Sequence, residues 1–135
     1  MKKFRGYIFS RAFQGERVPQ HVQNIVIRDF CKKKKIDYLL SSSEYTMKNS
    51  FLILNEIIIN LKKIDGIVAY SLFQMPDDEL KRNQIFIKVL KEKKIFYFAN
   101  ENLELKIKED LIFLNNIWNI KKTLPLSYNE KIKYI

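Results

Sequence analysis

Near its middle the chain reads Asp65-Gly66-Ile67-Val68-Ala69-Tyr70-Ser71, and this run is the clearest structural signal in the sequence. Asp65-Gly66 is typical of a turn, and the next four residues are all apolar or aromatic. A strand that helices cover on both faces is apolar at every position, whereas a half-exposed strand alternates. We therefore predict a buried central strand of a parallel sheet over residues 67–70, ending at Ser71.

Short apolar runs of strand length recur on both sides of this segment, and amphipathic stretches separate them. Strands are predicted over residues 4–9, 36–40, 67–70 and 95–98. Helices are predicted from Pro19 to the lysine run 32–35, over 50–63, from Pro76 to about Lys93, and after residues 100–102. This βα alternation predicts an α/β fold: a small doubly wound parallel sheet of four or five strands with helices on both faces, as in flavodoxin. Residues 1–120 are expected to form one domain, and residues 121–135 an extended or partly ordered tail.

The helical spacing of apolar residues predicts which side of each helix faces the core. The second helix is nearly apolar all round, so we expect it to be buried on more than one side. The inward positions are predicted to be Val22, Ile25, Val26 and Phe30 in the first helix, Leu54, Ile57, Ile58 and Leu61 in the second, and Leu103, Ile107, Leu111, Leu114 and Trp118 in the fourth.

Length and composition fit a globular domain that needs no covalent staples: 135 residues, of which 47% are apolar. Cys31 is the sole cysteine, which excludes an internal disulfide and suggests a small core residue. One cysteine and one histidine, His21, cannot supply the ligands of a zinc site, so we predict no metal and no cofactor. No run approaches about eighteen apolar residues and no signal-peptide pattern is present, which predicts a cytoplasmic protein without a membrane span.

Basic residues outnumber acidic residues 25 to 15, which gives a formal net charge of +10. Clustered lysines and arginines bind nucleic acid by displacing counterions from its phosphates. The densest run, residues 32–35, falls where the first helix should end, and the helix dipole stabilises cations there. The abundance of Lys, Ile and Asn is also what an AT-rich genome would produce. We therefore do not expect nucleic acid to be the main ligand.

Ligands of doubly wound sheets bind outside the carboxyl ends of the strands, near the point where the strand order reverses. The loop after the first strand places Arg11 and Arg17 beside a helix start. Guanidinium groups bind phosphate and carboxylate through paired hydrogen bonds, so this loop predicts an anion site. The alternative is that Arg11 pairs with Glu16 or Glu44 and only orders the loops. The other ligand-binding candidates in the strand-end loops are Gln14, Gln20, Tyr45, Tyr70, Gln74 and Asn100.

The candidates for a catalytic role in these loops are Ser10, Glu44, Ser71 and Glu101. Ser10 ends a strand and could be a nucleophile, but its one candidate base, His21, has no evident group to orient it. Glu44 and Glu101 would form a pair for acid and base chemistry if the fold brought them together. Ser71 would hydrogen-bond a sugar or polyol, or else cap a backbone group in a buried turn. The sequence leaves both an enzyme and a binding module open.

A first resemblance is carried by Gly6-Tyr7-Ile8-Phe9-Ser10, by Gln20 and Gln23, and by residues 65–70. In this layout residues 4–103 resemble the catalytic domain of serine recombinases, the resolvases and invertases. Those enzymes have an arginine two residues before the serine, and a Leu-Asp-Arg-Leu-x-Arg stretch whose arginines hold the scissile phosphate. In this chain Ile8 occupies the position two residues before Ser10, and residues 71–76 contain neither the aspartate nor the arginines. The resemblance therefore implies a resolvase-like fold and argues against strand exchange.

A second resemblance is carried by residues 7–11, 18–24, 40–41 with 44–45, and 70–76. Over residues 4–120 the chain resembles the sporadic carbohydrate cluster proteins of bacterial surface-polysaccharide gene clusters. This resemblance implies a role in lipopolysaccharide or other surface-carbohydrate biosynthesis, with an anionic or sugar-type small molecule as ligand. It brings no catalytic residues to carry over.

The alternative function is a noncatalytic module, derived from a resolvase-like domain, that binds nucleic acid or a partner enzyme through the basic N-terminal part and the tail. Binding of nucleic acid would weaken steeply with salt. A homodimer is a further option, because Ile117, Trp118 and Ile120 would form either an exposed association stripe or the closing edge of the core.

Overall fold

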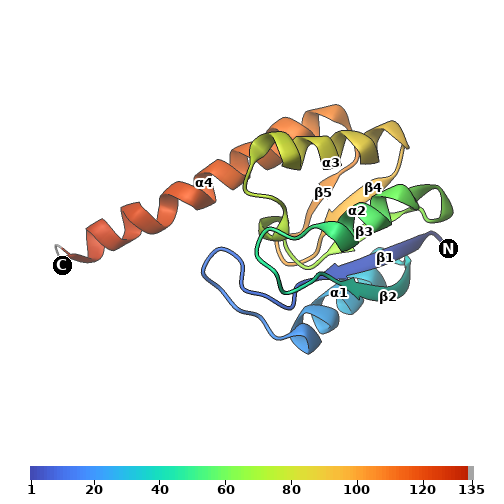
Figure 1. The fold of residues 1–135 in the computed structure, drawn as a ribbon, viewed down its shortest axis with the longest axis horizontal. Helices are drawn as coiled ribbons and strands as arrows, with labels where there is room; N and C mark the ends of the chain where they lie inside the picture. The colour runs from blue at the N-terminus through green and yellow to red at the C-terminus, as the bar shows by residue number, and fades with distance from the viewer. Residues whose placement is uncertain (134–135) are drawn as a thin grey trace.

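The computed structural model describes the backbone of residues 1–133 and the side chains of residues 1–122 (Figure 1). The strands are β1 (Lys3–Ile8), β2 (Asp37–Ser43), β3 (Gly66–Ala69), β4 (Ile95–Phe98) and β5 (Leu103–Leu105). The α-helices are α1 (Gln20–Lys34), α2 (Leu52–Ile59), α3 (Glu79–Lys91) and α4 (Lys108–Lys133), and the 3-10 turns are η1 (Leu61–Lys63) and η2 (Leu72–Gln74). Within this described part, no helix is both long enough and apolar enough to cross a membrane.

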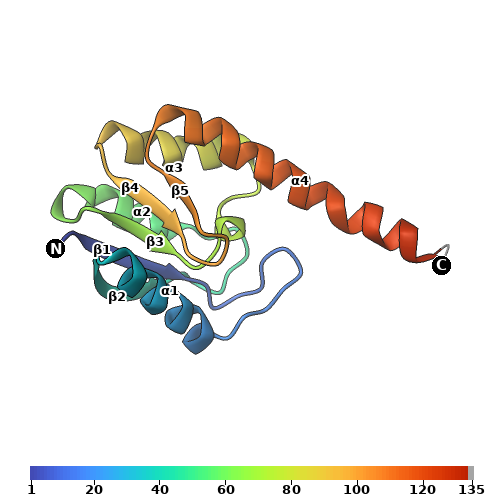
Figure 2. The ribbon, with the colours of Figure 1, turned by 180° about the vertical axis from the view of Figure 1, so that it is seen from behind.

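The five strands form one sheet in the order β2-β1-β3-β4-β5, in which β5 alone is antiparallel to its neighbour. Helix α1 covers one face of the sheet, whereas α2 and α3 cover the other (Figures 1 and 2). The predicted α/β class, with a mainly parallel sheet and helices on both faces, is confirmed. The connections from β1 to β2 and from β3 to β4 run in opposite directions, so the strand order reverses between β1 and β3.

Strand β3 is buried at every position, as predicted for a central strand. On the α1 face, the Tyr97 ring packs against Phe4 and Phe30, at centroid distances of 5.2 and 5.1 Å. Gly66 allows this packing, because a Cβ at that position would overlap the Ile95 carbonyl oxygen and the Phe4 ring. Cys31 lies in the same core, as predicted, and burial raises the pKa of its thiol to about 11.

The prediction that residues 103–105 begin the fourth helix is wrong, because they form β5. Asn102 has a positive φ of 54° and turns the chain back, so that Leu105 pairs with Phe96 and is fully buried. This pairing joins residues that are not neighbours in sequence, and helical spacing does not reveal it. Helix α4 instead begins at Lys108, where the Asp110 carboxylate accepts hydrogen bonds from the Lys106 and Ile107 amides.

Helix α4 also continues to Lys133, where an extended or partly ordered tail was expected from residue 121. It packs against α3, β5 and η2 and then runs past the rest of the domain (Figure 2). Trp118 is buried on Phe73 and on the Arg82 guanidinium, so it closes the edge of the core rather than forming an exposed stripe. Residues 134 and 135 of the expected tail lie outside the described residues.

The predicted inward face of α1 is confirmed in part: Phe30 is buried and Val26 packs against the core, but Ile25 does not face inward. Ile25 is 59% exposed, and the buried positions are Gln23, Ile27, Phe30 and Cys31. Gln23 faces the core because its side-chain amide both donates to and accepts from the backbone of Phe9. A buried polar side chain does not contribute to an apolar periodicity, so the pattern leaves out Gln23 and places Ile25 on the inward face instead.

Helices α2, α3 and α4 differ in smaller ways from expectation. The predicted inward residues of the second helix are all buried, but Leu52 and Ile59 are exposed, so α2 is covered on one side only. Helix α3 begins at Glu79 rather than Pro76, because Asp78 caps it and the Pro76 carbonyl binds Arg82 instead. Ile107, expected to face inward, precedes α4 and is 54% exposed.

Candidate functional site

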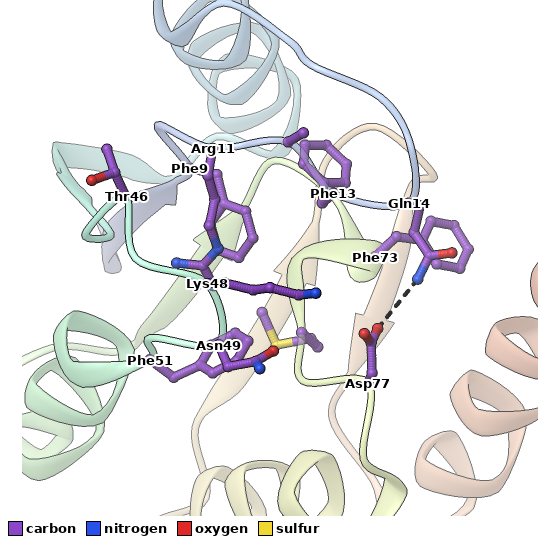
Figure 3. A pocket seen from close by; sticks show the side chains of 12 residues that line it. Phe9, Arg11, Phe13, Gln14, Thr46, Lys48, Asn49, Phe51, Phe73 and Asp77 are labelled. Carbon is purple, nitrogen blue, oxygen red and sulfur yellow. Dashed lines mark hydrogen bonds between the residues drawn. The ribbon is translucent and has the colours of Figure 1, made fainter.

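A cavity of about 330 Å³ lies at the carboxyl end of the sheet, where the strand order reverses (Figure 3). Its lining comes from three loops: residues 9–14 after β1, residues 46–51 after β2 and residues 73–77 after β3. The location agrees with the strand-end rule for doubly wound sheets. We refer to it as the strand-end cavity.

The loop after β1 forms a small hairpin over this cavity. Phe13 and Glu16 exchange two backbone hydrogen bonds of 2.8 and 2.9 Å. Gln14 and Gly15 between them both have positive φ, 50° and 75°, the geometry of a tight turn that favours glycine. The Gln14 amide reaches the Asp77 carboxylate at 3.5 Å, so the hairpin tip meets the loop after β3 at the cavity (Figure 3).

Arg11 joins the loops after β1 and β2. Its guanidinium lies 4.1 Å from the Phe9 ring centroid and 5.1 Å from that of Phe51. It donates hydrogen bonds of 2.7 and 2.8 Å to the carbonyl oxygens of Tyr45 and Ser50. Arg11 therefore orders these loops through backbone carbonyls rather than through Glu16 or Glu44. The guanidinium still forms part of the cavity wall.

The polar residues that line the strand-end cavity from the other two loops are Thr46, Lys48, Asn49 and Asp77. Lys48 extends across the opening in Figure 3. Among the residues with described side chains, the sole ion pair joins Lys33 and Asp29, so Lys48 and Asp77 have no charged partner within 4 Å. Both remain available to a ligand.

Sequence reasoning missed these four residues. The loop after the second strand was expected to contribute only residues 41–45, and Asp77 was assigned to the start of a helix. The available signal was the polar composition of residues 46–50, together with the preference of Asn for the left-handed conformation that Asn49 adopts.

Glu44 holds the start of α2. Its carboxylate is 2% exposed and accepts hydrogen bonds from the Tyr7 and Ser50 hydroxyls and from the amides of Tyr45, Ile53 and Leu54. Burial, and then the Glu44 charge, raise the pKa of Tyr7 far above its usual range. The Ser10 hydroxyl donates to the Glu44 carbonyl oxygen at 3.0 Å. Neither Ser10 nor Glu44 lines the strand-end cavity.

Glu101 holds the turn η2 in the same manner. Its carboxylate accepts hydrogen bonds of 2.7 Å from both the Ser71 hydroxyl and the Leu72 amide, and one of 3.1 Å from the Asn100 side chain. Ser71 in turn accepts from the Phe73 amide, so it caps a backbone group, as the alternative interpretation of residues 70–76 proposed. Glu44 and Glu101 thus bind different helical turns and share no hydrogen-bond partner among the described residues.

Comparison with known proteins finds likeness in structure but not in sequence. No family model and no curated protein matches the chain. A resolvase family site-specific recombinase from Streptococcus pneumoniae is 10% identical, with a TM-score of 0.61 and coverage of 97% of each chain. The N-terminal catalytic domain of TP901-1 integrase is 13% identical, with a TM-score of 0.56 and coverage of 93% of this chain and 97% of that one. This chain has a resolvase-like fold.

The resemblance to serine recombinases is thereby confirmed for the fold alone. None of the comparisons supports the resemblance to sporadic carbohydrate cluster proteins. In this resolvase-like domain the segment after β3 is the turn η2, and residues 71–76 contain none of the arginines of the recombinase pattern. Gln74 is fully buried and donates a 2.8 Å hydrogen bond to Gln23, so it does not reach the strand-end cavity.

A second, smaller cavity of about 210 Å³ adjoins the first in the resolvase-like domain, and Phe13, Gln14 and Phe73 line both. We refer to it as the side cavity. Of the predicted site residues, Ser71, Asn100 and Glu101 lie there, together with Glu16 and Lys121. The structure therefore brings Arg11 and Gln14 to the strand-end cavity, and Gln14, Ser71, Asn100 and Glu101 to the side cavity.

The remaining predicted ligand-binding residues line neither cavity. Arg17 is exposed, and the Gln20 amide donates to the Ser43 hydroxyl at 2.7 Å. Tyr45 is half exposed, and Tyr70 is buried against the Phe13 ring. Burial, and then the charges of Glu101 and Glu16, raise the pKa of Tyr70. No three His, Cys, Asp or Glu side chains converge as metal ligands among those described.

Proposed function

We propose that this domain binds a small anionic polyol, such as a phosphorylated sugar, in the strand-end cavity. The observation that carries the proposal is the combination in one cavity of an ammonium and a carboxylate, Lys48 and Asp77, beside aromatic side chains; among the described side chains neither group has an ion-pair partner. The volume of about 330 Å³ lies at the small end of the range for ligand pockets.

Each wall of the cavity matches a part of such a ligand. Sugar hydroxyls both donate and accept, and the Asp77 carboxylate and the Asn49 and Gln14 amides offer the complementary groups. The apolar face of a sugar ring packs on aromatic side chains, which Phe13 and Phe73 provide. Lys48 would neutralise the anionic group.

The wider role rests on resemblance alone. The likeness of the chain to sporadic carbohydrate cluster proteins would make the ligand a building block of a surface carbohydrate. If the domain also modifies its ligand, Ser71 and Glu101 are the candidates, because they face the side cavity next to the proposed ligand.

The test is a calorimetric titration with glucose 1-phosphate, glucose, inorganic phosphate and a short DNA duplex, each at about 50 mM and about 200 mM salt. Glucose 1-phosphate should bind at both salt concentrations and more tightly than glucose or phosphate. Lys48→Ala should weaken that binding about tenfold, because a hydrogen bond to a charged group is lost.

Lys62→Ala is the matched control, because it removes the same charge from an exposed position outside the cavities. Equal binding by Lys48→Ala and wild type would overturn the proposed site. Binding of DNA alone, lost at the higher salt, would favour the nucleic-acid module instead.

A further inference from the structure

A third hollow, of about 510 Å³, lies between α2 and α3 and opens beside the strand-end cavity. It is lined by the loop residues 47–51, by Leu52 and Asn55 of α2, by Pro76, and by one side of α3. We refer to it as the α2–α3 cleft. No residue proposed for the site from sequence lies in it.

Three lysines line the α2–α3 cleft, and no acidic residue does: Lys48, Lys81 and Lys88. All three are exposed, and among the described side chains none makes an ion pair. Lys81 and Lys88 are seven residues apart on α3, so two helical turns place them on one side of the helix, about 10 Å apart. Like charges gathered around one hollow repel each other, and an anion bound between them offsets this repulsion.

The cleft and the strand-end cavity adjoin, because Lys48, Asn49 and Phe51 line both. A ligand in the strand-end cavity can therefore extend past Lys48 toward α3. The three cations cover a longer path than a single phosphate, which Lys48 alone would neutralise. Exposed apolar side chains at the rim, Met47 and Leu52, would contact a group attached beyond the charged part.

We infer that the α2–α3 cleft holds the diphosphate of a sugar diphosphate ester whose sugar lies in the strand-end cavity. This inference rests on the proposed function for the sugar part. Lys48 binds the phosphate next to the sugar, and Lys81 and Lys88 bind the second phosphate. The shared chemistry is the diphosphate, and the group beyond it is either a nucleoside or a prenyl chain.

The experiment is a calorimetric titration of the full chain with inorganic pyrophosphate, glucose 1-phosphate, UDP-glucose, UDP and farnesyl diphosphate. Wild type should bind UDP-glucose about tenfold more tightly than glucose 1-phosphate, because further charged hydrogen bonds form. The double variant Lys81→Gln/Lys88→Gln should lose this advantage and most pyrophosphate binding, while its affinity for glucose 1-phosphate stays within about twofold of wild type.

The control is Lys32→Gln/Lys62→Gln, which removes two exposed charges far from the cleft lining and should leave all affinities within about twofold. Equal pyrophosphate and UDP-glucose binding by wild type and the Lys81/Lys88 variant would overturn the inference. A third outcome is that glucose 1-phosphate does not bind, while pyrophosphate binds in a way that depends on Lys81 and Lys88. This result would overturn the proposed function but support the α2–α3 cleft as an anion site. Tighter binding of UDP than of farnesyl diphosphate, neither of which carries a sugar, supports a nucleoside ester, and the reverse order supports a prenyl ester.

Discussion

The Tyr7 hydroxyl donates a 2.8 Å hydrogen bond to the Glu44 carboxylate, and both groups are buried. This contact joins β1 to the start of α2, because the same carboxylate accepts the amides of Ile53 and Leu54. Glu44 also accepts the Tyr45 amide, so the contact fixes both ends of the segment that carries Lys48.

The Tyr7 contact predicts a loss of stability in alkali. The pKa of Tyr7 in the folded chain is raised by burial and by Glu44 from its usual value of 10.0. Above pH 10.0 the unfolded chain releases this proton while the folded chain keeps it, so the free energy of unfolding falls by up to about 1.4 kcal/mol per pH unit. Tyr7→Phe should make this fall less steep in urea denaturation from pH 9 to 11. Tyr45→Phe, which removes an exposed hydroxyl, is the control, and identical slopes for Tyr7→Phe and wild type would contradict the assignment.

Glu44→Gln should lower the free energy of unfolding by about 3 kcal/mol. The NH2 group of glutamine cannot accept a hydrogen bond, so some of the N–H and O–H donors that now bind the carboxylate would lose their acceptor. Urea denaturation at pH 7 measures the change. Glu56→Gln, on the exposed side of α2, should leave the midpoint close to that of wild type. A shared midpoint for all three proteins would mean that Glu44 does not hold α2.

Gln23→Met should destabilise the domain by about 3 kcal/mol, because the buried backbone groups of Phe9 and the Val18 carbonyl lose their partner. The loop after β1 should also become easier to cleave by trypsin at Arg11 and Arg17. Gln20→Met removes one exposed hydrogen bond from the same helix and should do neither. Unchanged cleavage rates in the Gln23 variant would argue against its role in the loop.

Gly66→Ala should cost about 3 kcal/mol or more, because the added Cβ overlaps the Ile95 carbonyl oxygen and the strands β3 and β4 would have to separate. Gly15→Ala meets no neighbouring atom and should cost about 1 kcal/mol, from its positive φ alone. Thermal unfolding ranks the two variants, and a larger loss for Gly15→Ala would refute this account of the sheet.

Arg82→Lys should lower stability by about 2 kcal/mol and weaken binding of glucose 1-phosphate. The buried guanidinium donates hydrogen bonds to the Asn115 side chain and to the carbonyl oxygens of Pro76 and Asp77. The single ammonium group of lysine cannot reproduce the planar arrangement of these donors. Arg28→Lys on the surface of α1 is the control. Intact ligand affinity in a destabilised Arg82 variant would show that Arg82 supports the fold but not the cavity.

Local sequence signals predicted the strands well, and the reason is burial. Residues 67–70 and 95–98 are continuous apolar runs because helices or loops cover both faces of β3 and β4, and such runs need no information from distant residues. β5 escaped prediction because only its pairing with β4 makes residues 103–105 a strand. The burial of Gln23 in α1 escaped prediction for a related reason, because it depends on the contact of Gln23 with the Phe9 backbone.

For the candidate site, the order of strands and helices was enough to place a cavity at the carboxyl ends of the strands and to select the loops around it. Which side chains enter the cavity depends on contacts between residues far apart in the chain. Arg11, Glu44, Gln74 and Glu101 look like ligand groups in the sequence, but folding directs them largely to backbone groups that would otherwise be unpaired. Lys48, Asp77, Lys81 and Lys88 look like ordinary surface charges, and only the meeting of three loops with α3 gathers them around adjoining hollows.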